Sequence, residues 1–139
     1  MKVHHTAICT VDVAESLRFW RDGLGFEPIM DLSFEGDWRA LFGAPEDTLR
    51  SVFLGDPAEP STGIVELVDF GSVPGGPSAT GPAVGFFLVS VYTDVDGTLA
   101  RLAALGLGGP PRRIAVSGVA MAVVRDPNGV LVELVGLPG

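Results

Sequence analysis

Histidine and glutamate, whose side chains can bind metal ions and transfer protons, occur at a few positions that repeat along the sequence. The only histidines, His4 and His5, are adjacent near the N-terminus, and two glutamates, Glu66 and Glu133, each lie inside an apolar run. Because side chains alternate along a strand, only one of the two imidazoles can share a face with Cys9, and that one is His5. An ionised carboxylate buried without a partner is costly. The pattern predicts a site of imidazole and carboxylate groups, unless His5 is an ordinary hydrogen-bonded histidine and the glutamates face water.

These residues belong to a unit that the chain contains twice. A predicted strand over residues 3–10 is followed by Asp12, a suitable helix N-cap, with Glu15 completing a capping box. Apolar residues then follow at the spacing of one buried helix face, at Val13, Leu17, Trp20 and Leu24. Moving 82 residues along the chain repeats the pattern, with a predicted strand over 86–92, a cap at Asp94 and apolar residues at Val95, Leu99 and Leu102.

Both copies also end alike. The runs GIVELV (63–68) and GVLVELV (129–135) place Glu66 and Glu133 at equivalent positions. The sequence Asp-Pro-Asn-Gly at 126–129 is a strong hairpin signal between two β-rich runs. Each half is therefore predicted to fold as βαβββ.

The chain is predicted to form one α+β domain of two such modules. Its 139 residues, 47% of them apolar, suffice for a single buried core. Module one covers residues 1–70 and module two covers 83–139. The linker between them, GSVPGGPSATGP (71–82), is too rich in Gly, Pro and Ser to form a helix or strand.

Charge and cysteine content narrow the range of partners. A net charge of -8, with one lysine and eight arginines, repels nucleic acid and anionic lipid. No apolar run reaches the roughly 18 residues of a membrane span. The single cysteine excludes an internal disulfide, and the N-terminus lacks the pattern of a secretory signal, so we expect a cytoplasmic protein. The expected partner is a small molecule or a second copy of the chain.

These features together resemble the vicinal oxygen chelate superfamily, which includes glyoxalase I, extradiol dioxygenases and the bleomycin resistance proteins. The resemblance rests on the two βαβββ modules, the opening H-T-A-I-x-x-x-D-V, a helix ending in LGF (24–26) and the closing DPNGxxxEL. It implies that the curved sheets of the two modules form a cleft. It also implies a divalent metal ion at the floor of the cleft, of which Zn, Ni, Co, Mn and Fe suit the residues.

The resemblance also implies the metal ligands. They are His5 on the first strand and Glu66 and Glu133 on the closing strands. Two converging carboxylates repel each other, so one takes a proton or a cation lies between them. The remaining family ligand is usually a histidine on the first strand of module two, where the repeat places Phe87, or Phe86 after a slip of one residue. Neither binds metal, and extradiol chemistry, which needs two histidines and a carboxylate, is not expected.

Further residues are predicted to line the cleft. The segment FEGDWRALFG (34–43) predicts a short helical turn between the second and third strands, which either packs as a lid or forms a substrate wall in which an arginine binds a carboxylate or carbonyl. Phe87 is either a packing residue or a platform for a flat substrate. Cys9 has no neighbouring base in sequence to activate it as a nucleophile. The substrate-binding candidates are Cys9, Trp38, Arg39, Phe42 and Phe87.

Two functions remain open. The first is a divalent-metal-dependent lyase or isomerase acting on a small carbonyl compound: the ion polarises the carbonyl and stabilises an enediolate, while Glu133 moves the α-proton as general base. The alternative is a metal-free protein that sequesters an apolar or aromatic compound, as bleomycin resistance proteins do. Glyoxalase I itself is less favoured, because Cys9 occupies a position where those enzymes tend to carry an arginine for glutathione. We expect a homodimer, since so few charges leave apolar surface for a twofold interface.

Overall fold

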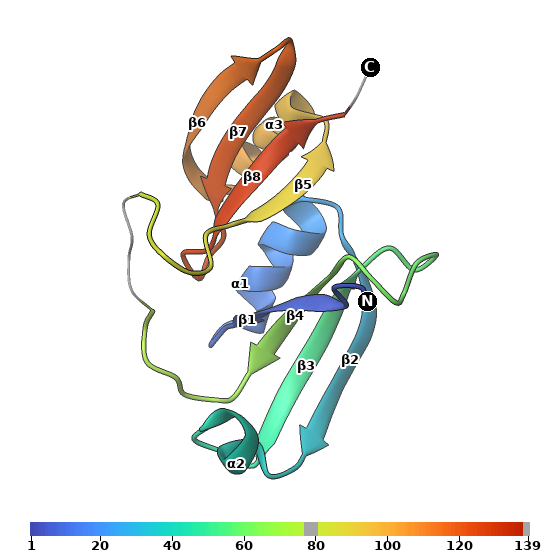
Figure 1. Ribbon diagram of the computed structural model, residues 1–139, viewed down its shortest axis with the longest axis vertical. Helices are drawn as coiled ribbons and strands as arrows, with labels where there is room; N and C mark the ends of the chain where they lie inside the picture. The colour runs from blue at the N-terminus through green and yellow to red at the C-terminus, as the bar shows by residue number, and fades with distance from the viewer. Residues whose placement is uncertain (77–80, 138–139) are drawn as a thin grey trace.

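The computed structural model describes residues 1–76 and 81–137 and contains two separate four-stranded sheets (Figure 1). In each sheet the first strand is parallel to the last, and the other neighbours are antiparallel. Sheet A, in the order β1-β4-β3-β2, contains β1 (His5–Cys9), β2 (Glu27–Glu35), β3 (Thr48–Gly55) and β4 (Ile64–Asp69). Sheet B, in the order β5-β8-β7-β6, contains β5 (Val89–Thr93), β6 (Gly108–Val116), β7 (Val119–Arg125) and β8 (Leu131–Gly136). The predicted α+β fold with two βαβββ modules is confirmed.

Helices connect the first two strands of each module. In module one, α1 (Val13–Leu17) continues into a π-helical segment, η1 (Arg18–Gly23), and in module two the helix is α3 (Val95–Leu105). A further short helix, α2 (Trp38–Phe42), joins β2 to β3, where the sequence predicted a helical turn. No helix in the described ranges is long and apolar enough to cross a membrane. The described parts of the expected linker, 71–76 and 81–82, contain no helix or strand, and residues 77–80 lie outside the description.

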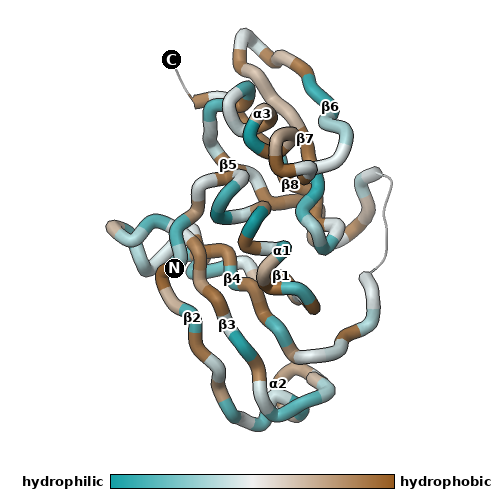
Figure 2. Tube along the Cα trace, turned by 180° about the vertical axis from the view of Figure 1, so that it is seen from behind, coloured by the Kyte–Doolittle hydropathy of each residue, from teal (hydrophilic) through white to brown (hydrophobic). Residues whose placement is uncertain are grey.

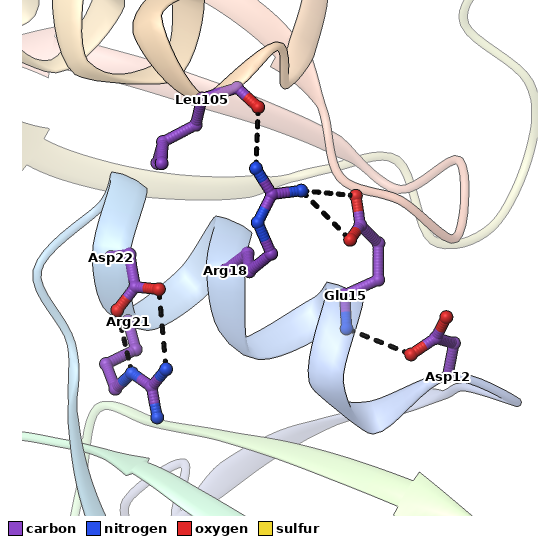
Figure 3. Close-up of polar contacts among 6 residues, drawn as sticks. All are labelled: Asp12, Glu15, Arg18, Arg21, Asp22 and Leu105. Carbon is purple, nitrogen blue, oxygen red and sulfur yellow. Dashed lines mark hydrogen bonds and ion pairs between the residues drawn. The ribbon is translucent and has the colours of Figure 1, made fainter.

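The helix caps form at the residues predicted from the sequence, with one difference in their hydrogen bonds. The Asp12 carboxylate accepts a hydrogen bond from the Glu15 backbone N–H at 3.0 Å, and Asp94 caps α3 through the N–H of Gly97. The return bond of a capping box is not made. The Glu15 carboxylate instead pairs with Arg18 at 3.0 Å, as Figure 3 shows. The Asp12 N–H donates to the Thr10 hydroxyl, which replaces the missing acceptor.

One apolar core lies between the two sheets and takes in the helices of both modules. Phe19 and Trp20 of η1 are fully buried. Gly23 and Leu102 are so close that a Cβ on Gly23 would lie 2.5 Å from Leu102 Cδ2, so any larger residue where η1 meets α3 would force the Leu102 side chain to move. In Figure 2, apolar residues recur along β3, β4, β7 and β8. The strand residues of this core are Ile8, Val52, Leu54, Val65, Leu67, Ala122, Val124, Val132 and Leu134.

The buried carboxylate of Asp126, at the β7–β8 turn, joins the two modules. Asp126 is 5% exposed, and its Oδ2 accepts from Trp20 Nε1 of module one at 3.2 Å. Within the turn it also accepts from the Asn128 and Val130 backbone N–H groups and from the Asn128 amide. The same amide donates to the Ser16 hydroxyl of α1 at 3.1 Å. The predicted Asp-Pro-Asn-Gly turn therefore also docks module two on the helix of module one.

Replacing Asp126 by alanine is expected to lower the free energy of unfolding by about 2 to 4 kcal/mol, because several buried donors, including the Trp20 indole, lose their acceptor. Trp20→Phe, which removes a single donor, should cost less. Asp22→Ala, which removes an exposed partner of Arg21, should stay within about 0.5 kcal/mol of the wild type. Urea denaturation with unchanged m-values measures all three. A loss for Asp126→Ala no larger than for Asp22→Ala would contradict this role.

Candidate functional site

The structure brings His5 and Glu66 together on the face of sheet A that points away from the helices. β1 and β4 are parallel neighbours in which Ala7 pairs with Glu66, so His5 lies two residues before that pair on the same face. His5 Nε2 is 3.4 Å from Glu66 Oε1, and the two side chains are 37% and 15% exposed. The other oxygen, Glu66 Oε2, accepts from the Ser51 hydroxyl of β3 at 2.5 Å. The Ser51 hydroxyl therefore holds Oε2 of the Glu66 carboxylate, and Oε1 faces the His5 imidazole.

His4 also belongs to this group, contrary to the strand alternation that placed it on the opposite face. β1 begins at His5, so the alternation does not extend to His4. The Nδ1 atoms of the two histidines are 2.8 Å apart, at hydrogen-bond distance. Both rings also contact Phe53 of β3, with ring centroids 5.8 and 5.5 Å away. A hydrogen bond of this kind to the second ring nitrogen orients a histidine whose Nε2 is the functional atom.

Glu133 lies on the other sheet. It accepts from the Ser90 hydroxyl of β5 at 2.7 Å and faces away from the core of module two. Among the described residues, no group of three or more His, Cys, Asp or Glu side chains lies close enough together to hold a metal ion. The prediction that one chain gathers His5, Glu66 and Glu133 in one cleft is therefore wrong. The helices occupy the space between the modules, so the two glutamates lie on separate sheet faces.

A hollow of about 190 Å³ surrounds Glu133 on sheet B. Its walls come from β6, β7 and β8 and include Arg112, Ile114, Met121 and Val123. Sequence reasoning missed Arg112. The only signal was the Arg-Arg pair after two prolines, and a sequence does not tell which arginine of such a pair faces which side of a strand.

The position that corresponds to His5 in module two is Leu88. Ser90 pairs with Glu133 as Ala7 pairs with Glu66, and two residues back from Ser90 is Leu88, the residue directly before β5. Phe87, predicted for this position, lies before β5 and is 48% exposed. The error arose because the chain from the strand residue that pairs with the glutamate to the helix cap is one residue shorter in module two. It runs from Ala7 to Asp12 in module one and from Ser90 to Asp94 in module two. Leu88 is equally unable to bind a metal ion.

The segment around α2 forms an exposed aromatic cluster at the end of sheet A. Trp38 and Phe42 are stacked, with ring centroids 5.8 Å apart and planes 10° apart, and Phe42 contacts Phe70. α2 buries none of its residues, so it is not a packed lid. Arg39 already has two carboxylate partners, with Nε 3.2 Å from Asp47 and Nη2 3.8 Å from Glu46. The aromatic rings stay candidates for a substrate wall, whereas the arginine is engaged locally.

Cys9 follows His5 and Ala7 along the same face of β1 and is exposed. Partial burial raises the pKa of its thiol above the ordinary value, and the negative charge of Glu66 raises it further. A raised pKa leaves less thiolate at neutral pH, so Cys9 lacks the activation that a nucleophile requires. Its place beside Glu66 is compatible with the predicted contact to a substrate.

The donor atoms fit a divalent ion only in part. An imidazole nitrogen and a carboxylate oxygen that face each other suit borderline divalent metals, and His4 supplies the orienting hydrogen bond that such histidines usually have. Catalytic zinc sites use three protein ligands. A single chain provides two, and the third donor on an equivalent strand, Glu133, lies on the other sheet.

Comparisons with known proteins agree with this architecture. Residues 2–134 match the family model described as the Glyoxalase/Bleomycin resistance protein/Dioxygenase superfamily. The chain is 36% identical to lactoylglutathione lyase-like protein terB of Aspergillus terreus over 148 residues, which covers 98% of this chain and 75% of that protein. A glyoxalase family protein from Bacillus cereus has the same fold, with a TM-score of 0.78 at 16% identity, covering 100% of this chain and 95% of that one. The trypanothione-dependent glyoxalase I of Leishmania major has a TM-score of 0.67 at 25% identity, covering 98% and 86%.

The raised pKa of Cys9 provides a test of its contact with Glu66. Glu66→Gln removes the charge, so the pKa should fall, the thiolate fraction at pH 8 should rise, and iodoacetamide should react measurably faster with this single cysteine. Asp96→Asn removes an equal charge on α3, on the other module, and should leave the rate unchanged. An unchanged or slower rate in Glu66→Gln would show that the two groups do not interact.

Proposed function

Because the chain belongs to the glyoxalase/bleomycin resistance protein/dioxygenase superfamily, we propose that it is a divalent-metal-dependent lyase or isomerase acting on a small carbonyl-containing substrate. The observation that carries this proposal is the pair of His5 Nε2 and Glu66 Oε1, 3.4 Å apart on an accessible sheet face. The relative named lactoylglutathione lyase-like, at 36% identity, supports a lyase-type activity.

In this proposal His5, Glu66 and Glu133 hold the metal ion. A bound divalent ion supplies Lewis-acid polarisation of a substrate carbonyl. Glu66 is kept in place by the Ser51 hydroxyl, and His5 is oriented by His4. Glu133 acts as the general base that takes the proton from the carbon next to the carbonyl and returns it to the neighbouring carbon. The Ser90 hydroxyl positions the Glu133 carboxylate for this transfer.

A second copy of the chain completes the site in our proposal. The face of sheet A that carries Glu66 also exposes the apolar side chains of Leu32 and Phe34. The face of sheet B that carries Glu133 likewise exposes Ile114 and Val116. A twofold homodimer in which sheet A of each copy covers sheet B of its partner buries both faces and creates two identical sites. Each site then takes His5 and Glu66 from one copy and Glu133 from the other.

Mixing two inactive variants tests the shared site. His5→Ala and Glu133→Gln chains, unfolded together and refolded, should regain metal binding that neither variant has alone. Half of the random dimers are mixed, and each mixed dimer has one intact site, so about one quarter of the wild-type sites should return. Titration calorimetry with Mn, Ni and Zn measures the number of sites, and light scattering should give the dimer mass at micromolar concentration.

A matched control distinguishes a metal site shared between two copies from an effect of refolding any two variants together. His5→Ala and Glu66→Gln chains each damage sheet A, so every site in their mixed dimer lacks one ligand and no binding should return. Recovery in this control, or none in the first mixture together with a monomer mass, would contradict the shared site.

The missing fourth ligand gives an independent test. Leu88→His places an imidazole at the position that corresponds to His5 and should tighten metal binding by about tenfold or more. Phe87→His adds the same group one residue further from β5 and should change the affinity little. If the wild type shows no heat with any of the three metals and only Leu88→His binds, the metal-free binding function is the correct one.

A further inference from the structure

Arg112 differs from every other arginine in the described parts of the chain. The other seven arginines each have a hydrogen bond or an ion pair with a carboxylate, a hydroxyl or a backbone carbonyl. No such contact involves Arg112 within residues 1–76 and 81–137, although the side chain is exposed on a strand of a chain with a net charge of -8. An arginine without a partner among so many carboxylates is available for an external anion.

The register of β6 directs this side chain toward Glu133. β6 is an edge strand, and its pairing with β7 shifts between Gly108 and Arg112, at the two prolines that precede Arg112. A shift of this kind decides which face each following residue points to. Arg113 consequently points to the helix side, where it pairs with Asp96 of α3, and Arg112 points to the opposite face.

Arg112, Val123, Glu133 and Ser90 form one row across sheet B. Arg112 pairs with Val123, Val123 pairs with Glu133, and Glu133 pairs with Ser90. Two strand spacings, about 10 Å, therefore separate the backbones of Arg112 and Glu133. The hollow above Val123 lies between them, and Ile114, Met121, Ala122 and Arg113 also line it.

We propose that Arg112 is a specificity-determining residue that binds the carboxylate of a small oxo acid, with the apolar chain of the acid over Val123 and its carbonyl end directed toward Glu133. A guanidinium binds a carboxylate through two parallel hydrogen bonds. Of the two arginines that line the hollow, Arg113 already pairs with Asp96, so Arg112 offers one positive charge, which suits a singly charged carboxylate better than a phosphate dianion. This inference rests on the proposed function, because Glu133 belongs to the same site, and it adds the chemical class of the substrate.

The test compares two ligands that differ only at the proposed contact. 4-Oxopentanoate and 2,5-hexanedione share the unit CH3–CO–CH2–CH2, which ends in a carboxylate in the acid and in an acetyl group in the dione. Binding of each is followed by the methyl NMR signals of Ile114 and Met121 in the purified protein. The wild type should bind the acid about tenfold or more tightly than the dione. Arg112→Gln should abolish this preference, with dione binding unchanged as evidence that the hollow is intact.

Arg21→Gln is the control, because it removes the same charge from η1 of module one, outside the hollow. It should keep the preference for the acid. Equal wild-type affinities for acid and dione, or an equal loss in Arg112→Gln and Arg21→Gln, would overturn the proposal. The readout does not require turnover. A preference for the acid that depends on Arg112, without any metal binding, would support this inference and contradict the proposed function. Metal binding without that preference would support the proposed function and contradict this inference.

Discussion

The packing of the two modules through their helices is the constraint on which the rest of the structure depends. The buried Asp126 carboxylate joins the β7–β8 turn to Trp20, and Gly23 allows η1 to approach Leu102 of α3. Because these contacts occupy the inner side of both sheets, each sheet has one face committed to the core. Polar side chains in the middle of the strands are therefore favoured on the other face, and that is where His5, Glu66 and Glu133 are found.

The two modules share a topology but offer different chemistry on these faces. Both place a glutamate at the same position of the closing strand and hold it with a serine hydroxyl. Those serines come from different strands, Ser51 from β3 and Ser90 from β5, so the likeness does not extend to each contact. Sheet A adds imidazoles, whereas sheet B adds a guanidinium and apolar walls. A site built from one face of each kind therefore combines imidazole and carboxylate groups with a guanidinium.

Local features were predictable from the sequence, whereas features that depend on pairing between distant strands were not. The caps at Asp12 and Asp94 and the turn at 126–129 depend on neighbouring residues, and they appear as predicted. His5 and Glu66 came together in the sequence analysis only through the family resemblance, and they lie on one face because β1 and β4 are parallel neighbours. The contact of His4 with His5 depends on where β1 begins. The correspondence of Leu88 to His5 depends on the chain between β5 and the cap of α3, which is one residue shorter than its counterpart in module one. The orientation of Arg112 depends on a register shift, which no periodicity reveals.

Two arginines make reciprocal contacts between the modules. Arg18 of η1 donates to the carbonyl of Leu105 at the end of α3 at 2.8 Å, as Figure 3 shows, and Arg101 of α3 donates to the carbonyl of Gly23 at the end of η1 at 3.1 Å. Each arginine thus reaches the carboxyl end of the other helix, where a cation is favoured. Exchange of equivalent contacts is the property of an isologous interface between two identical subunits. The two modules of one chain therefore pack against each other in the manner of two subunits related by a twofold axis, with the helix of each module supplying an arginine to the end of the other.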